Sequence, residues 1–261
     1  MAKSARITIK HNTQQLLVWL YSSNGLQRLV PIEDTNYLWW QLVSEGRRSL
    51  LRHLVKNDYI TVNTIRRRKY LCLTSFGREC VERLFPGLSP QQRFWQGQWQ
   101  LIVLTGANEA AAKARSLRQL LRQEGAFLLE RGVYMCPAPL NSEFKNRLTN
   151  DYRGQLLIWE TEKCLFGDER LIIFRKSGLL EVLNLYSGIS NDLSRLTDLR
   201  KSEKYSIDQY MSLLISTFTC FFDILSQDSG LIRFYFKNEL CGEEILSRLQ
   251  NLALFREEIA L

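Results

Sequence analysis

Histidine is scarce in this sequence: His11 and His53 are the two histidines among 261 residues, and neither has a plausible nucleophile close to it in the chain. The sequence also lacks GxGxxG, P-loop, GxSxG and HExxH motifs. These motifs supply the backbone amides, nucleophiles and metal ligands that phosphate binding and hydrolysis need. We therefore expect no enzyme activity and no cofactor.

Cysteine pairs and long apolar runs are missing as well. The six cysteines lie far apart, without a CxxC pair or a nearby histidine, so we expect reduced thiols, no metal site and a cytoplasmic protein. The longest apolar segment, Met211–Leu225, is interrupted by polar residues and is shorter than the roughly 20 residues that span a bilayer. We expect a buried helix there and no membrane partner.

Positive charge is concentrated in the first third of the chain. Residues 1–95 hold fifteen Lys and Arg against six Asp and Glu, whereas the remaining residues hold twenty against twenty-one. This asymmetry favours a polyanion-binding module joined to a near-neutral body. The alternative is a basic face that is simply solvated and has no partner.

The basic third follows the element order of a winged helix-turn-helix. Apolar spacing predicts three helices and then two strands: Thr13–Ser22, Tyr37–Val43, Ser44–Lys56, Tyr59–Val62 and Tyr70–Thr74. The third helix has an inward apolar stripe made of Leu50, Leu51, Leu54 and Val55. In this fold the third helix enters the major groove of DNA, and the hairpin contacts phosphates or the minor groove.

The candidate DNA-binding residues come from these two elements. They are Arg47, Arg48, Ser49, Arg52 and Lys56 on the third helix, and Arg66, Arg67, Arg68 and Lys69 at the tip of the hairpin. Arginine suits both places because its planar fork bonds guanine or phosphate in a bidentate manner. Each cation taken alone is better explained as a solvated surface charge; the whole set favours DNA. His53 is expected to pack or to contact phosphate.

The middle of the chain predicts a ferredoxin-like sandwich. The breaker cluster Phe85–Pro90 marks a boundary. The pattern then gives a βαββαβ order with elements at Trp99–Leu104, Glu109–Gln123, Phe127–Leu129, Val133–Cys136, Asn141–Leu148 and Leu156–Trp159. The carboxyl third predicts helices at Leu179–Tyr186, Asp192–Leu199, Ile207–Leu225 and Glu243–Phe255. We expect an α+β protein with domains at 1–88, 94–176 and 177–261.

Several motifs resemble the PaaX-type transcriptional repressors, which join a winged helix to a ferredoxin-like middle domain and a helical tail. The segment Trp95–Trp99 reads W-x-G-x-W, and Arg131–Pro137 resembles the hairpin of that family. The segment YLCLTSFG at Tyr70–Gly77 resembles the end of its wing, Arg48–Leu54 its recognition helix, and Leu179–Tyr186 the start of its tail.

The resemblance implies a ligand, with one departure in the tail. An acyl-coenzyme A-like effector is implied by analogy with the family alone. The counterpart of its proline-rich tail segment, Asp228–Gly242, keeps Asp228, Leu240 and Gly242 but has no proline.

The middle domain of that family is in turn similar to the small nuclease subunit of CRISPR adaptation complexes. That nuclease holds a metal-binding aspartate at the end of its first strand, where a hard cation needs oxygen ligands. The equivalent segment Leu104–Ala107 contains no carboxylate. We therefore expect no nuclease chemistry through that site.

Three functions stay open at this point. The leading one is an effector-responsive DNA-binding regulator, a repressor that acts as a homodimer on double-stranded DNA, because specific affinity usually needs two linked modules. The second is a nucleic-acid or protein interaction component of a CRISPR or defence locus. The third is a nuclease that uses an unrecognised site.

Overall fold

A computed structural model describes residues 11–22, 27–33, 47–89, 98–105, 111–123, 125–136, 140, 142–161, 164–202, 206–235 and 241–253. The described chain is a mixed α+β protein with two antiparallel sheets, which confirms the predicted fold class. It divides into two compact units. Unit 1 holds residues 1–89, 185–227 and 240–261, and unit 2 holds residues 90–184 and 228–239.

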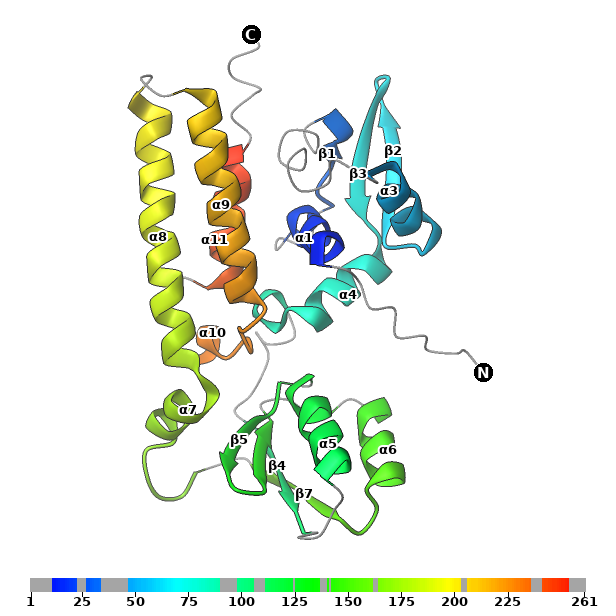
Figure 1. The fold of residues 1–261 in the computed structure, drawn as a ribbon, viewed down its shortest axis with the longest axis vertical. Helices are drawn as coiled ribbons and strands as arrows, with labels where there is room; N and C mark the ends of the chain where they lie inside the picture. Colours follow the sequence, from blue (N-terminus) through cyan, green and yellow to red (C-terminus); the bar gives the residue numbers. More distant parts are fainter. Residues whose placement is uncertain are drawn as a thin grey trace. The chain divides into compact units, whose positions relative to one another are not determined.

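Unit 1 contains a three-stranded sheet with helices from both ends of the chain (Figure 1). Its elements are α1 (His11–Leu20), β1 (Val30–Pro31), α3 (Arg47–Lys56), β2 (Ile60–Ile65), β3 (Arg68–Leu73), α4 (Ser75–Leu84), the 3-10 helix η1 (Pro86–Leu88), most of α8 (Leu179–Ser202), α9 (Ile207–Leu225) and α11 (Gly242–Ala253). The sheet has the order β1-β3-β2, and both pairs are antiparallel. The described elements α1, α3 and the β2–β3 hairpin follow the order of the first helix, third helix and hairpin of a winged helix-turn-helix, and the region of the second helix lies outside the described residues.

Helix α1 is the centre of unit 1. Every residue from Leu16 to Tyr21 is buried, because α1 is contacted by β3 and α4 and also by the carboxyl helices. The Trp19 ring packs edge-on against Phe218 of α9, with ring centroids 5.1 Å apart. From α11, the Gln250 side chain donates to the backbone carbonyls of Trp19 and Tyr21, at 2.9 and 2.8 Å. The carboxyl helices therefore hold the helix that supports the winged-helix sheet.

Unit 2 is a four-stranded antiparallel sheet with two helices on one face (Figure 1). Its elements are β4 (Trp99–Leu104), α5 (Ala111–Gln123), β5 (Phe127–Glu130), β6 (Val133–Cys136), α6 (Ser142–Asp151), β7 (Leu156–Thr161), α7 (Glu169–Ser177), the start of α8 and the short helix α10 (Ile232–Tyr235). The order β5-β6-β4-β7 is that of the predicted βαββαβ sandwich. Residues of α5, α6 and the inner face of the sheet, such as Leu121, Leu148 and Ile102, form one core cluster.

Helices α7 and α10 are tied to the sheet through Glu169. Its carboxylate oxygen accepts from the indole of Trp99 at 2.7 Å and from the hydroxyl of Tyr235 at 3.0 Å. Burial is the main cause that raises the pKa of Tyr235, with Glu169 adding to it, so this hydroxyl stays a donor. The second tryptophan of the W-x-G-x-W segment is thus an anchor for these helices.

Several sequence predictions differ from the structure. Leu179–Tyr186 and Asp192–Leu199, predicted as two helices, are parts of the single helix α8, because Ile189 continues its buried stripe. Helices α4 and α7 were not predicted. The three domains expected at 1–88, 94–176 and 177–261 stay a prediction; within unit 1 the carboxyl helices pack with α1. The predicted helix Tyr37–Val43, and Trp95–Gly97 and Pro137 of the family motifs, lie outside the described residues.

Candidate nucleic-acid interface

Helix α3 has one buried face and one cationic face. Leu54 is fully buried, and Leu50 and Leu51 are half-buried. The side chains of Ser49, Arg52, His53 and Lys56 are exposed, as the prediction of an outward cationic face requires. The prediction for Val55 is wrong: it is 44% exposed, because only about three positions per two turns of a surface helix reach the core.

The end of α3 is fixed by a Schellman motif. The amide of Tyr59 donates to the carbonyl of Leu54 at 2.9 Å, and the amide of Asp58 donates to that of Val55 at 3.1 Å. Asp58 has a φ of 58°, the left-handed conformation that this motif needs. Tyr59 is buried and directly precedes β2. The residues between α3 and β2 are therefore held by backbone hydrogen bonds to the helix.

Residues Thr74–Gly77, the TSFG part of the wing motif, also hold the end of α3 in place. The Thr74 hydroxyl donates to the carbonyl of Asp58 and accepts from the amide of Gly77 at 2.9 Å, so Thr74 caps α4 while it holds the end of α3. A Cβ on Gly77 would lie 2.0 Å from the carbonyl oxygen of Tyr59. Only glycine allows α4 to approach this backbone, and α3, the hairpin and α4 are thereby fixed together.

The tip of the β2–β3 hairpin is a two-residue turn made of arginines. Ile65 pairs with Arg68, so Arg66 and Arg67 form the whole loop. Their φ angles are 47° and 69°. Positive φ at both central residues defines a type I′ turn, where Asn-Gly is the preferred sequence. Two arginines in this conformation are strained, at roughly 1 to 2 kcal/mol each.

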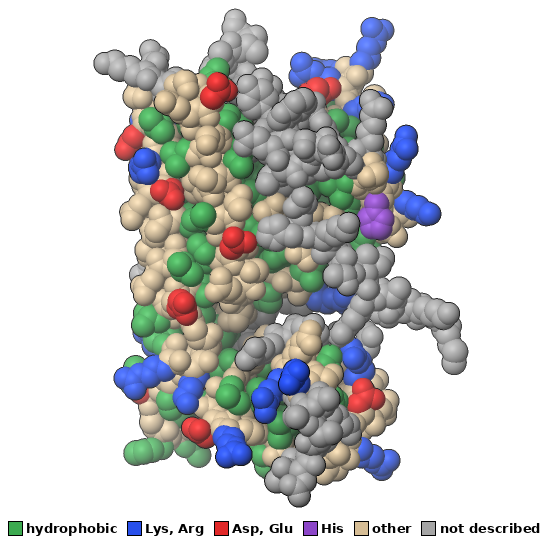
Figure 2. Space-filling model, viewed as in Figure 1, with side chains coloured by type: hydrophobic (Ala, Val, Ile, Leu, Met, Phe, Trp, Pro, Cys, Tyr) green, Lys and Arg blue, Asp and Glu red, His purple; other side chains and the backbone are tan. Residues whose placement is uncertain are grey.

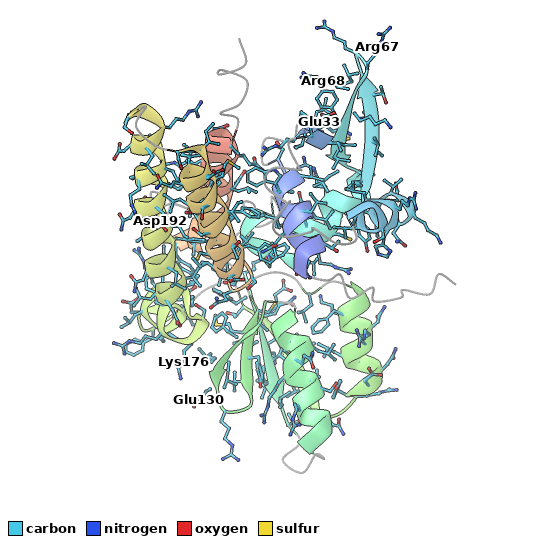
Figure 3. All side chains as sticks on the ribbon, turned by 45° about the horizontal axis from the view of Figure 1, so that its top comes forward. Glu33, Arg67, Arg68, Glu130, Lys176 and Asp192 are labelled. Atoms are coloured by element: carbon cyan, nitrogen blue, oxygen red, sulfur yellow. The ribbon has the colours of Figure 1, made fainter. Side chains whose placement is uncertain are left out.

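All four cations of the hairpin tip are exposed: Arg66, Arg67, Arg68 and Lys69. Arg67 lies at the tip and points away from the sheet (Figure 3). Lys and Arg side chains gather at this tip and beside α3 on the surface of unit 1 (Figure 2). We call the exposed residues Ser49, Arg52 and Lys56 of α3, together with these four, the cationic surface. Exposed Val62 and Ile65, which sequence reasoning did not single out, lie on the same hairpin.

Two predicted residues, Arg47 and Arg48, remain, and Arg78 is a further cation of the basic third that was not predicted to bind DNA. Arg47 and Arg48 begin α3, but their side chains lie outside what the structure describes. Arg78, which follows the hairpin in the basic third, is half-buried; it lies over the Tyr21 ring and 3.8 Å from Glu82. Arg78 is therefore a packing residue rather than part of the cationic surface.

Burial shifts the pKa of several groups behind this surface. It raises the pKa of Tyr59, and it raises the pKa of Tyr21, whose hydroxyl donates to the carbonyl of Leu88 at 2.7 Å. Burial lowers the pKa of Arg28 to about 10, where the guanidinium lies 5.1 Å from the Trp19 ring centroid. Arg28 is still a cation at neutral pH, and the two phenols are neutral. These three groups therefore keep their charge state around pH 7.

In the described part of the chain, no cluster of His, Cys, Asp and Glu could hold a metal ion. None of the described helices is both long enough and apolar enough to cross a membrane.

Comparison with protein families identifies the middle of the chain. Residues 92–165 match the family described as the PaaX protein central Cas2-like domain. This part of the chain is similar to the PaaX central domain. This confirms the predicted resemblance where its motifs are most specific. In this region β4 ends at Leu104 and is followed by Thr105, and neither residue carries a carboxylate.

Comparison with solved structures gives similar chains. One of them is the uncharacterized protein Rv0674 from Mycobacterium tuberculosis, at 14% identity and a TM-score of 0.45, covering 94% of this chain and 97% of that one. Among curated proteins, none matches the sequence.

Proposed function

We propose that this protein is a sequence-specific DNA-binding transcriptional regulator, acting as a repressor, whose winged helix binds double-stranded DNA. One observation carries the proposal: a single compact fold displays the exposed cations of α3 and of the β2–β3 tip, and a Schellman motif and the Thr74 cap fix the two elements to each other. The similarity of residues 92–165 to the PaaX central domain supports it.

The two elements have different tasks in this proposal. Arg52, one turn into α3, can present its guanidinium to a base edge in the major groove, and Arg47, Arg48 and Ser49 precede it at the end that enters first. Arg66 to Lys69 contact phosphates or enter the minor groove, and Lys56 contacts phosphate. Sequence is therefore recognised by the helix, and affinity is increased by the hairpin.

The test begins with selection of genomic DNA fragments by the full chain, which supplies a specific duplex. Replacing Arg52 by Ala should then reduce the preference for this duplex over a scrambled one by about 5- to 150-fold, equal to about 1 to 3 kcal/mol. The variant Arg175→Gln, which removes an exposed cation of α7, is the control and should change nothing.

Neutralising the hairpin should have the opposite signature. With Arg66 to Lys69 all replaced by Gln, binding to both duplexes should weaken by the same factor. The slope of log affinity against log salt should also become shallower by about 0.9 for each phosphate that the protein no longer neutralises. Equal losses on both duplexes for every variant, Arg52→Ala included, would contradict the division of tasks between helix and hairpin.

A homodimer is part of the proposal. One winged helix makes few phosphate contacts, and two linked modules on a symmetric site reach the affinities of specific regulators. Sedimentation of the full chain at micromolar concentration tests this directly, because a monomer mass would contradict it. Control by a small-molecule effector of acyl-coenzyme A type, through the middle and carboxyl regions, and a cytoplasmic location stay predictions.

The Cas2-like match of residues 92–165 favours one alternative, an interaction component of a CRISPR or defence locus that binds nucleic acid or protein without cleaving it. Selected fragments that lie in CRISPR arrays rather than in promoters would favour this alternative. A metal-dependent cleavage assay separates both proposals from a nuclease.

A further inference from the structure

Helix α5 of the central domain carries a second cationic face. Its thirteen residues include four Lys and Arg and no Asp or Glu. Leu117, Leu120 and Leu121 are buried in the core of unit 2, and Arg115 and Arg118 are exposed. Because these two arginines are three residues apart, they lie next to each other on the solvent side. The sequence places Arg122 four residues further along the same series.

The neighbouring helix extends this face. Helices α5 and α6 lie side by side on the same side of the sheet (Figure 1), and they share one core cluster. Lys145 of α6 and Arg153, just after it, are exposed. Asp151, at the end of α6, is exposed as well and offsets part of this charge. The structure shows no ion pair for Arg115, Arg118, Lys145 or Arg153 among the residues that it describes.

This pattern is unfavourable for an isolated helix. Like charges three or four residues apart destabilise a helix by about 0.2 to 0.5 kcal/mol per pair, and stable surfaces mix both signs. Successive arginines rise by about 4.5 to 6 Å along α5. This rise exceeds the roughly 3.4 Å axial charge spacing of one DNA strand, and the long, flexible arginine side chains can reach phosphates across that difference.

We propose that the outward face of α5, centred on Arg115 and Arg118, contacts the phosphate backbone of the same DNA that the winged helix binds. The inference rests on the proposed function, and it makes the central domain a sequence-independent second contact. The α5 contact increases the affinity for DNA and its salt dependence, whereas α3 determines which DNA sequence is bound.

The test compares the full chain with the variant Arg115→Gln/Arg118→Gln on the selected duplex and on a scrambled duplex. The slope of log affinity against log salt should become shallower by about 1.8 on both, which is about 0.9 for each of the two phosphates released from the protein. The preference between the two duplexes should stay unchanged. The variant Arg115→Lys/Arg118→Lys keeps the charges and should keep most of the slope.

The control variant Arg175→Gln/Lys201→Gln removes the same charge from exposed positions of α7 and α8. It should keep the wild-type slope of log affinity against log salt. If its slope became shallower by as much as that of the α5 variant, the effect would come from net charge alone and the proposal would be overturned. An unchanged slope in the α5 variant would also overturn it. If the α5 variant has a shallower slope while the hairpin and Arg52 variants bind as wild type, the proposed function fails and the α5 contact stands.

Discussion

Replacing Arg66-Arg67 by Asn-Gly should make the hairpin more stable and DNA binding weaker. The two arginines form the whole loop between paired Ile65 and Arg68, with φ angles of 47° and 69°. Asn and Gly adopt these angles at little cost, and they are the preferred residues of a type I′ turn. The turn itself gives no reason for two arginines, and the proposed function accounts for them by their charge.

The size of the gain follows from the backbone. Relief of left-handed strain at two positions is worth roughly 2 to 4 kcal/mol, and glycine returns about 1 kcal/mol through the entropy of the unfolded chain. A net stabilisation of about 1 to 3 kcal/mol corresponds to roughly 5- to 150-fold slower exchange of the hairpin amides that open locally. Hydrogen exchange of β2 and β3 measures it without requiring that the whole chain unfold in one step.

The matched control removes two charges without touching the turn. Arg68 and Lys69 lie in β3, outside the left-handed region, so Arg68→Gln/Lys69→Gln should leave amide exchange unchanged. Both double variants should flatten the salt dependence of DNA binding by up to about 1.8. Faster exchange in the Asn-Gly variant would refute the strain, and wild-type DNA binding in both variants would refute the role of the tip.

Two further substitutions test how α3 and α1 are held. Gly77→Ala should destabilise unit 1 by about 3 kcal/mol or more, since its Cβ would lie 2.0 Å from the Tyr59 carbonyl oxygen. The control Gly188→Ala, in the middle of α8 where a Cβ meets no other atom, should be neutral or stabilising by up to about 1 kcal/mol. Gln250→Leu should cost about 1 to 3 kcal/mol, because two buried carbonyls at the end of α1 lose their donor. Urea unfolding measures all three, and a Gly77→Ala protein as stable as the wild type would show that the corner is not tight.

Elements with strong local signals could be predicted from the sequence. Strands β4 and β6 and helix α9 have the predicted bounds, because alternation, turn residues and breakers mark both of their ends. The order of the central sheet also follows from the order of its elements, and the family match to residues 92–165 agrees with the motifs found there.

The misses have physical causes. Ser187–Asn191 looks like a helix break, yet Ile189 is buried within α8, so tertiary packing outweighs weak helix propensity there. Helix α4 begins inside the wing motif and was not predicted. Thr74, which caps it by accepting from the amide of Gly77, is the local signal that could have indicated its start. The hydrogen bonds of Gln250 with α1 join residues about 230 positions apart, and no local pattern indicates them.

The candidate site was predicted in composition but not in detail. The run of cations at Arg66 to Lys69 indicated an exposed hairpin tip, and their exposure agrees with it. The left-handed turn depends on the register of Ile65 with Arg68, which a shift by one residue would change. Arg78 is another cation of the basic third, and only the fold shows that it lies against Tyr21.

The most direct measurement is photo-crosslinking of the full chain to its selected duplex, with a photoreactive amino acid placed at Arg52 of α3, at Arg67 of the hairpin tip, or at Arg195 on exposed α8 as the control. The proposal predicts crosslinks to DNA from Arg52 and Arg67 and none from Arg195. Crosslinks from Arg195 alone, or none from either Arg52 or Arg67, would contradict a DNA-binding surface made by α3 and the hairpin.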